Sequence, residues 1–222
     1  MSRVFANREQ AGHELVQALQ RRPGVWPAGS RLVVCALPRG GVPVGAVLAR
    51  ALGCPLELLL VRKIAAPGQP ELALGAVAEG TPPELLVDEA TRGATAAGRG
   101  WVDDQVMLAL AEIARRRQRY LHGRPPAEVV GATVIVVDDG AATGSTVRAA
   151  VQALRRRGPA RIVLALPVAP AEVLAQLRPL VDEVVCLAEP VPFQAVGLHY
   201  GDFHQVEDEE VVRLLDEAAR GG

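Results

Sequence analysis

Two adjacent carboxylates, Asp138 and Asp139, follow an apolar β-branched run and precede a loop of small residues. The run TVIVV predicts a buried strand, and the loop GAATGST leads into an amphipathic stretch that predicts a helix. A small-residue loop that opens a helix presents backbone N–H groups and the positive end of the helix dipole, which suits a phosphate. Carboxylates beside such a loop are repulsive unless the ligand also brings hydroxyl groups and a divalent cation. The segment therefore predicts a site for a phosphorylated sugar bound with Mg²⁺.

Other phosphate-binding loops do not fit this segment. A Walker A loop needs a Lys before its final Ser or Thr, and here Gly144 is followed directly by Ser145 and Thr146. A dinucleotide fingerprint needs three spaced glycines, and this loop has only Gly140 and Gly144. An ordinary capped turn before a helix is the alternative for an isolated DDG, but the whole stretch favours a ligand site.

Basic residues follow two other predicted strands. Arg39, Gly40 and Gly41 come after the apolar run at 32–37, and Arg62-Lys63 comes after the run at 55–61. Lys63 is the single lysine among the 24 basic residues of the chain. Each group also has an explanation without function. Arg39 could be an ordinary loop cation, and Arg62-Lys63 could be strand-end charges that extend into water. The position of the solitary lysine favours a functional role.

The elements that must position these residues alternate between strands and helices. Strands are predicted at 32–37, 55–61, 133–137, 162–166 and 184–187, and helices at 45–52, 146–157 and 171–177. Continuous apolar strands, each followed by a helix, indicate an α/β fold with a doubly wound, mainly parallel sheet. An excursion at about 62–126 holds a predicted hairpin, 72–78 with 84–87, and a long helix at 102–121. We expect one domain over residues 1–222 with this inserted region.

Composition excludes several classes of protein. Half of the 222 residues are hydrophobic, and 24 basic against 25 acidic side chains leave a formal charge of −1. This balance predicts no nucleic-acid partner and no anionic membrane partner. The apolar runs are far shorter than the roughly 20 residues of a membrane span, and no signal peptide is recognised, so we expect a cytoplasmic protein. The three cysteines are widely spaced and read as reduced thiols.

The run VVDDGAATGST resembles the signature of the type I phosphoribosyltransferases, which bind 5-phosphoribosyl 1-pyrophosphate (PRPP). The segments LPRGGVPV, VRKIAAPGQPELALGAV and FQAVGLHYGDF extend the resemblance, over nearly the whole chain, to a bacterial subgroup without an assigned acceptor. The resemblance implies a type I phosphoribosyltransferase-like fold with a small hood built from the chain termini. The segment FANREQAGHELVQAL is expected to supply a helix that caps the site.

The same resemblance implies a role for each matching residue. Asp138 and Asp139 would bind the ribose hydroxyls and Mg²⁺, and Lys63 and Arg62 would neutralise the leaving pyrophosphate. The catalytic residues would thus be Lys63, Arg62, Asp138 and Asp139. The pyrophosphate loop is often a site of a cis peptide bond that does not involve proline. The implied PRPP-binding residues are Arg39, Gly40, Gly41, Asp138, Asp139, Gly140, Ala141, Ala142, Thr143, Gly144, Ser145 and Thr146. Phe193 and Tyr200 are two of only seven aromatic residues and could stack on a planar acceptor, with core packing as the equal alternative.

The expected activity is transfer of the phosphoribosyl group from PRPP to a nucleobase-like small-molecule acceptor, with release of pyrophosphate. The alternative is a regulator that binds PRPP or a nucleotide without turnover. Hydrolysis of phosphoribosyl esters is a third, weaker hypothesis. The protein could form a homodimer. Members of the fold that use hypoxanthine or guanine carry an Asp where this chain has Ala142. The resemblance therefore favours adenine, a pyrimidine or a non-standard base, with Glu71, Glu79 and His199 as candidate general acids or bases.

Overall fold

The computed structural model describes residues 4–80, 82–95 and 97–220. A five-stranded sheet in the order β2-β1-β6-β7-β8 forms its centre, and every neighbouring pair is parallel. Its strands are β1 (Leu32–Ala36), β2 (Leu56–Leu58), β6 (Thr133–Val137), β7 (Arg161–Val168) and β8 (Glu183–Ala188). Every residue of β6 is buried, because both faces of the sheet are covered. The predicted doubly wound parallel sheet is confirmed.

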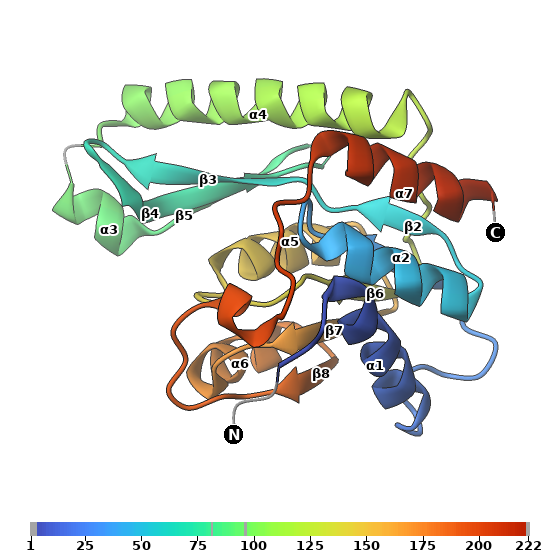
Figure 1. The fold of residues 1–222 in the computed structure, drawn as a ribbon. Coiled ribbons are helices and arrows are strands. Elements are labelled where there is room, and N and C mark those ends of the chain that lie inside the picture. The colour runs from blue at the N-terminus through green and yellow to red at the C-terminus, as the bar shows by residue number, and fades with distance from the viewer. Residues whose placement is uncertain (1–3, 81, 96, 221–222) are drawn as a thin grey trace.

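Helices cover both faces of this sheet (Figure 1). Alternate residues of each strand point to opposite faces, and they divide the core into two hydrophobic clusters. One cluster holds α1 (Arg8–Gln20) and α2 (Gly41–Leu52), and the other holds α5 (Ser145–Arg156) and α6 (Ala171–Leu177). Helix α1 packs on α2, β7 and β8, so most of it covers the sheet and does not form the expected cap.

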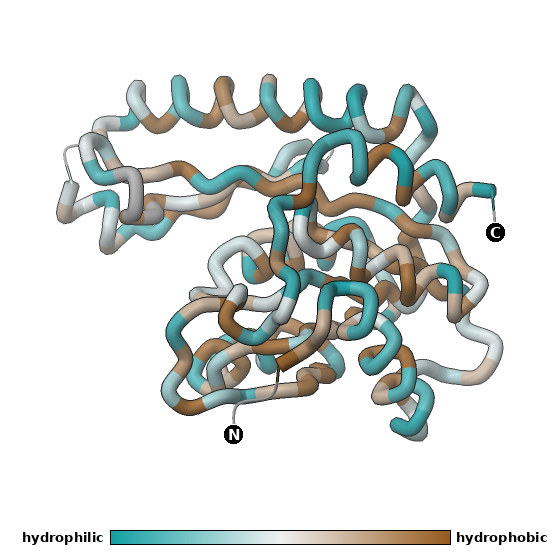
Figure 2. The backbone as a smooth tube through the Cα atoms, viewed as in Figure 1, coloured by the Kyte–Doolittle hydropathy of each residue, from teal (hydrophilic) through white to brown (hydrophobic). Residues whose placement is uncertain are grey.

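The predicted excursion forms a second, three-stranded antiparallel sheet under a long helix (Figure 1). We call β3 (Val61–Ala66), β4 (Gln69–Ala78) and β5 (Glu84–Val87) the arm. Helix α3 (Glu89–Ala94) follows the arm, and α4 (Arg99–Leu121) packs along it through Val102, Ala109 and Ile113. Figure 2 shows hydrophobic and hydrophilic residues alternating along α4, as expected for a helix with one buried side.

The hairpin and the long helix were predicted, but β3 was not. The apolar run at 55–61 was predicted as one strand, whereas β2 ends at Leu58 and β3 begins at Val61. The run LELLLV contains no Gly or Pro to mark the point at which the chain leaves one sheet for the other. Arg62 and Lys63 consequently lie inside a strand of the arm and not after a strand of the central sheet.

The N-terminal segment meets residues 199–201, which precede the last helix, beside the central sheet. Phe5 forms a parallel bridge with Tyr200, and its N–H donates to the His199 carbonyl oxygen at 2.8 Å. The Gly201 N–H donates to the Phe5 carbonyl oxygen at 2.7 Å. The short turns η1 (Arg178–Leu180) and η2 (Val196–His199) precede the last helix, α7 (Asp208–Arg220), which packs on α2 and α4. The predicted hood from the termini is therefore present. In the described part of the chain, no helix is both long and apolar enough to cross a membrane.

Candidate active site

The candidate site lies at the carboxyl ends of β1 and β6, which are neighbours in the sheet. Ala36 and Val137 are paired in register, so the loop after β1 and the acidic pair after β6 leave the sheet side by side. The chain then turns to opposite faces, because α2 belongs to one hydrophobic cluster and α5 to the other. Such a reversal of direction creates a crevice at the sheet edge, which is where open α/β sheets bind ligands.

The glycines of the loop after β1 permit close packing against the acidic pair. A Cβ on Gly40 would collide with Oδ2 of Asp139. A Cβ on Gly41 would lie 2.7 Å from the carbonyl oxygen of Val137. The sequence predicted that these glycines wrap a pyrophosphate; in the structure they also bring this loop against the two carboxylates. The Pro38–Arg39 peptide bond in the same loop is cis.

The two carboxylates are each held by one oxygen. Asp138 Oδ1 accepts a hydrogen bond from the Asp139 N–H at 2.9 Å. Asp139 Oδ2 accepts one from Arg8 Nε at 2.8 Å, and the side chains of Arg8 and Asp139 are only 8% and 13% exposed. Within the described residues, no hydrogen bond to the second oxygen of either carboxylate is found. The pair therefore keeps two acceptor atoms for a ligand.

The surroundings disfavour two negative charges at this pair. Burial raises the pKa of Asp138 well above its ordinary value, and the neighbouring charge of Asp139 raises it further. Burial also raises the pKa of Asp139, while the hydrogen bond and charge of Arg8 oppose that rise. Hydroxyl donors or a cation at the two remaining oxygens would stabilise the ionised form. A pair perturbed in this way at a sheet edge is typical of a functional site.

The loop after the acidic pair ends at the N-terminus of α5. Gly144 is the residue before the helix, with φ of 70°, and it has no side chain to cap the first-turn N–H groups. A Cβ on Gly144 would also lie 2.8 Å from Cγ1 of Val173 on α6, so the loop packs closely here. The first turn of α5 thus leaves backbone donors for an anion.

The predicted phosphate-binding residues of this loop differ in what they can offer. Ala141 is buried, and its N–H donates to the Val168 carbonyl oxygen at 3.0 Å, so that group is already engaged. Ala142 and Thr143 are exposed, while Ser145 and Thr146 are half-buried. Thr143 Oγ1 and Ser145 Oγ lie 3.1 Å apart and share a hydrogen bond. Ala141 therefore shapes the loop, and the hydroxyl groups gather around the N-terminus of α5.

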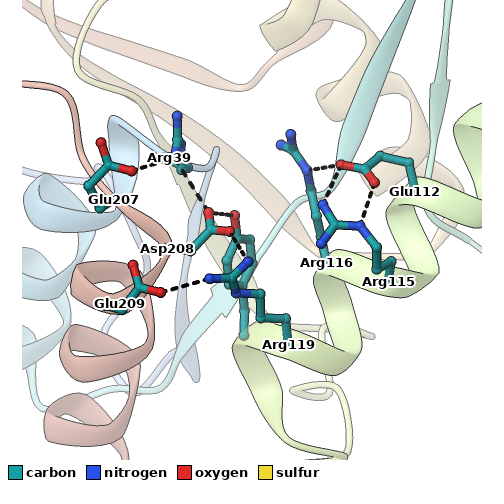
Figure 3. A network of polar contacts seen from close by, with 9 residues as sticks. Arg39, Glu112, Arg115, Arg116, Arg119, Glu207, Asp208 and Glu209 are labelled. Carbon is teal, nitrogen blue, oxygen red and sulfur yellow. Dashed lines mark hydrogen bonds and ion pairs between the residues drawn. The ribbon is translucent and has the colours of Figure 1, made fainter.

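Arg39 contacts the acidic start of α7 (Figure 3). Its Nη1 lies 3.5 Å from both Glu207 Oε2 and Asp208 Oδ1, and its side chain is 31% exposed. Asp208 is held more tightly from α4, by the Tyr120 hydroxyl at 2.6 Å and by Arg119 at 2.7 Å. Burial and the Asp208 hydrogen bond raise the pKa of Tyr120 to about 12. A network that spans α4 and α7 thus reaches the loop after β1.

The predicted catalytic pair, Arg62 and Lys63, is divided between the two faces of the arm. Ile64 belongs to the cluster that includes α4, so the alternation of side chains along β3 places Arg62 on the α4 face. Lys63 is paired with Ala76, which is paired with Leu86, and these three share the opposite face. Lys63 is exposed, and it makes no ion pair within the described residues.

Lys63 shares its face of the arm with a groove of about 550 Å³. Ala76 and Leu86 line this groove from the arm, and Ser145 and Arg148 line it from α5. The groove therefore extends from the lysine face of the arm to the N-terminus of α5. Of the predicted pair, the lysine lies on the side of the loop between the acidic pair and α5.

The predicted acceptor residues lie in the hood. Tyr200 is 6% exposed, its ring contacts those of Phe5 and Phe203, and its hydroxyl donates to the Asp139 carbonyl oxygen at 2.5 Å. This burial argues against the acceptor-stacking role predicted for Tyr200 and makes it a support for Asp139. Phe193 stacks on His199 with ring centroids 5.7 Å apart and is half-buried.

The structure separates the three candidate acids and bases. The side chain of Glu71 lies outside the described residues. Glu79 forms an ion pair with Arg117 of α4 at 2.9 Å, and burial raises its pKa. Glu79 also interacts with Arg157, at the far end of α5 from the phosphate loop. His199 is buried beneath Phe193. Glu79 is therefore a poor candidate for proton transfer at this site.

The sequence reasoning missed Arg8. Arg8 is 131 residues from Asp139 in the chain, and no motif or spacing connects the two. Within the described residues, no group of three or more His, Cys, Asp or Glu side chains could hold a metal by itself. A cation at Asp138 and Asp139 would therefore need further ligands from a bound molecule, as phosphate-bound Mg²⁺ commonly has.

Comparisons with known proteins agree with the fold and the motifs. Residues 27–200 match the family model for the phosphoribosyl transferase domain, and the chain belongs to this family. Two proteins from strains of Mycobacterium tuberculosis, each named "Putative phosphoribosyl transferase", are 42% identical over 98% of the chain. The chain spans about half of their length, 48%. The crystal structure of TT1426 from Thermus thermophilus is 40% identical, with a TM-score of 0.80 over 96% of this chain and 98% of that one.

Proposed function

We propose that this protein binds PRPP with Mg²⁺ and transfers its phosphoribosyl group to a nitrogen of a nucleobase-like acceptor. The observation that carries the proposal is the acidic pair, in which each carboxylate uses one oxygen inside the protein and keeps the other for a ligand. Two such oxygens on adjacent residues suit the neighbouring hydroxyls of a ribose. The uncapped N-terminus of α5, a few residues further along the chain, suits its 5′-phosphate.

The reaction breaks the bond between C1′ and the pyrophosphate oxygen and forms a bond between C1′ and the acceptor nitrogen. The electron pair of the broken bond leaves with pyrophosphate, and the acceptor supplies the new pair and loses a proton to a base or to water. C1′ gains positive character during this exchange, while negative charge grows on pyrophosphate. The protein therefore acts mainly by holding the ribose in place and by stabilising the leaving group.

We assign Arg39 and Lys63 to the leaving group. The two ion pairs of Arg39 are 3.5 Å long, whereas Arg119 lies 2.7 Å from Asp208. A multiply charged pyrophosphate can therefore compete for the Arg39 guanidinium. Lys63 lies on the face of the arm that borders the groove leading to α5. Arg62 lies on the other face of the arm, so we assign it a smaller role than Lys63.

Asp138 and Asp139 fit a magnesium ion that is shared with the ligand. Carboxylate oxygens are ligands that Mg²⁺ prefers, and it is commonly held by one or two carboxylates together with substrate phosphates. When bound, the ion would neutralise part of the charge on pyrophosphate. Burial raises the pKa of both carboxyls, and a bound cation would stabilise their ionised form.

The test measures binding and turnover separately. Calorimetry with PRPP and MgCl₂ measures binding, and a pyrophosphate-release assay with adenine, pyrimidines, hypoxanthine, guanine and non-standard bases measures turnover. We expect PRPP binding, and release of pyrophosphate with at least one base. Binding without turnover on any base would favour the regulator over the enzyme. Absence of PRPP binding in the folded protein would refute both the enzyme and a regulator that binds PRPP.

A further inference from the structure

Arg8 occupies an unusual position for a cation. It is the first residue of α1, where the helix dipole is positive and disfavours a positive side chain. Its side chain is nevertheless buried, with 7% of the residue exposed. A buried charge at this end of a helix requires a compensating partner, and Asp139 is that partner at 2.8 Å.

Three contacts from two segments of the chain fix the Arg8 guanidinium. Its Nε donates to Asp139 Oδ2, and its Nη1 donates to the His204 carbonyl oxygen at 2.9 Å. Its Cζ lies 3.9 Å from the centre of the Phe203 ring, in the geometry of a cation–π contact. Phe203 in turn stacks on Tyr200, with ring centroids 5.0 Å apart. The guanidinium is thus held in one orientation against the carboxylate.

Asp139 is fixed on its other sides as well. The Tyr200 hydroxyl donates to its carbonyl oxygen, and Gly40 packs against its carboxylate. Among the described residues, the charged and titratable groups that face this carboxylate are Arg8 from α1, Asp138 from the end of β6 and Tyr200 from the hood. Arg8 is the cation of this set, and its hydrogen bond engages Oδ2 and leaves Oδ1 to the site.

We propose that Arg8 is a positioning residue for Asp139, which holds Oδ2 of its carboxylate so that Oδ1 accepts a ribose hydroxyl. This inference rests on the proposed function, because it assumes that the acidic pair binds ribose. It makes the first turn of α1 part of the sugar site, although Arg8 need not touch the ligand.

The inference is tested with Arg8→Met, which keeps an unbranched side chain and removes the charge, and with Arg8→Gln, which keeps a donor without the charge. The matched control is Arg21→Met, an exposed arginine at the other end of α1. PRPP affinity with MgCl₂ is measured by calorimetry at pH 7, and thermal unfolding checks that each variant is folded. Rescue of affinity by the donor of Arg8→Gln separates positioning of Asp139 from a general loss of packing.

We expect Arg8→Met to bind PRPP at least tenfold more weakly than the wild type at pH 7, because Asp139 Oδ2 loses its partner and the carboxylate can turn. Arg8→Gln keeps a donor, so it should bind PRPP more tightly than Arg8→Met does, and it serves as the test if Arg8→Met does not fold. Arg21→Met should match the wild type.

Two results would overturn the inference. A folded Arg8 variant that binds PRPP as tightly as the wild type at pH 7 would show that Asp139 does not need Arg8. An equal loss of affinity in Arg8→Met and Arg8→Gln would show a general structural role that does not depend on a donor to Oδ2. A wild type that binds no PRPP would instead refute the proposed function, so the two failures are distinguishable.

Discussion

Replacement of Asp138 by Asn is expected to make the protein more stable and worse at binding PRPP. Asn keeps the Oδ1 acceptor that the Asp139 N–H uses at 2.9 Å, so the local backbone has no reason to change. The substitution removes one of two adjacent buried charges. Burial raises the pKa of both carboxyls, and the charge of Asp139 raises the pKa of Asp138 further. A group that is unfavourable for folding and is nevertheless retained is typical of function.

The sign of the stability change follows from proton linkage. A carboxyl with a raised pKa in the folded protein binds protons there that the unfolded chain releases. Stability therefore falls as pH rises from the ordinary Asp pKa through the raised value, and the full cost is present above it. Removal of such a charge commonly adds about 0.5–2 kcal/mol. For a chain of 222 residues, each 1 kcal/mol raises the melting temperature by roughly 2–4 °C.

The loss of affinity follows from the hydrogen bond that Asp138 would make. A hydrogen bond to a charged group contributes about 1.5–3 kcal/mol, and its loss corresponds to a roughly 10- to 150-fold larger dissociation constant. Calorimetry with PRPP and MgCl₂ measures this change, and thermal melts from pH 4 to pH 8 measure stability. Asp103→Asn, at an exposed position of α4, is the control and should alter neither. A folded Asp138→Asn that binds PRPP normally, or one that is less stable at neutral pH, would refute the reasoning.

Three further predictions concern the arm, the hood and the acceptor. Lys63→Ala should lower kcat at least tenfold with little change in PRPP affinity. Arg62→Ala should lower kcat less, because the two side chains lie on opposite faces of β3, and steady-state kinetics checks both variants. Tyr200→Phe removes the hydrogen bond to the Asp139 carbonyl oxygen and should cost about 1 kcal/mol in chemical denaturation, while PRPP affinity changes less than for Asp138→Asn. Adenine, a pyrimidine or a non-standard base should be used faster than hypoxanthine or guanine, because Ala142 supplies no carboxylate; fastest turnover of either purine in the panel would contradict this.

The sequence predicted the parts of the site that are contiguous in the chain. Asp138 and Asp139 follow a fully buried strand, and the strand, the turn and the helix after them all have local signatures. The five parallel strands were recognisable as apolar runs, and β1, β6 and β7 are each followed by a helix. Local patterns of this kind determine where a strand ends and which residues come next.

Contacts between distant segments were not predictable in this way. Arg8 belongs to a helix whose sequence gives no reason to select one residue of its first turn, and its partner is 131 residues away. Tyr200 was considered for stacking because aromatic residues are few, but their number does not determine which ring faces the core and which the site. The split between β2 and β3 was missed because the pairing of each strand, and not its own composition, decides the sheet that it joins.

The placement of Asp139 depends both on the local sequence and on contacts with distant segments. Its position after β6 is a local property, but its carboxylate is oriented by Arg8 near one end of the chain and its carbonyl oxygen by Tyr200 near the other. The same two segments hold each other through the Phe5–Tyr200 bridge and through the Arg8 contacts with Phe203 and the His204 carbonyl oxygen. Assembly of the hood and orientation of Asp139 therefore depend on one set of contacts. A substitution that loosens the hood must also disturb the carboxylate, even when it lies far from the sheet edge in sequence.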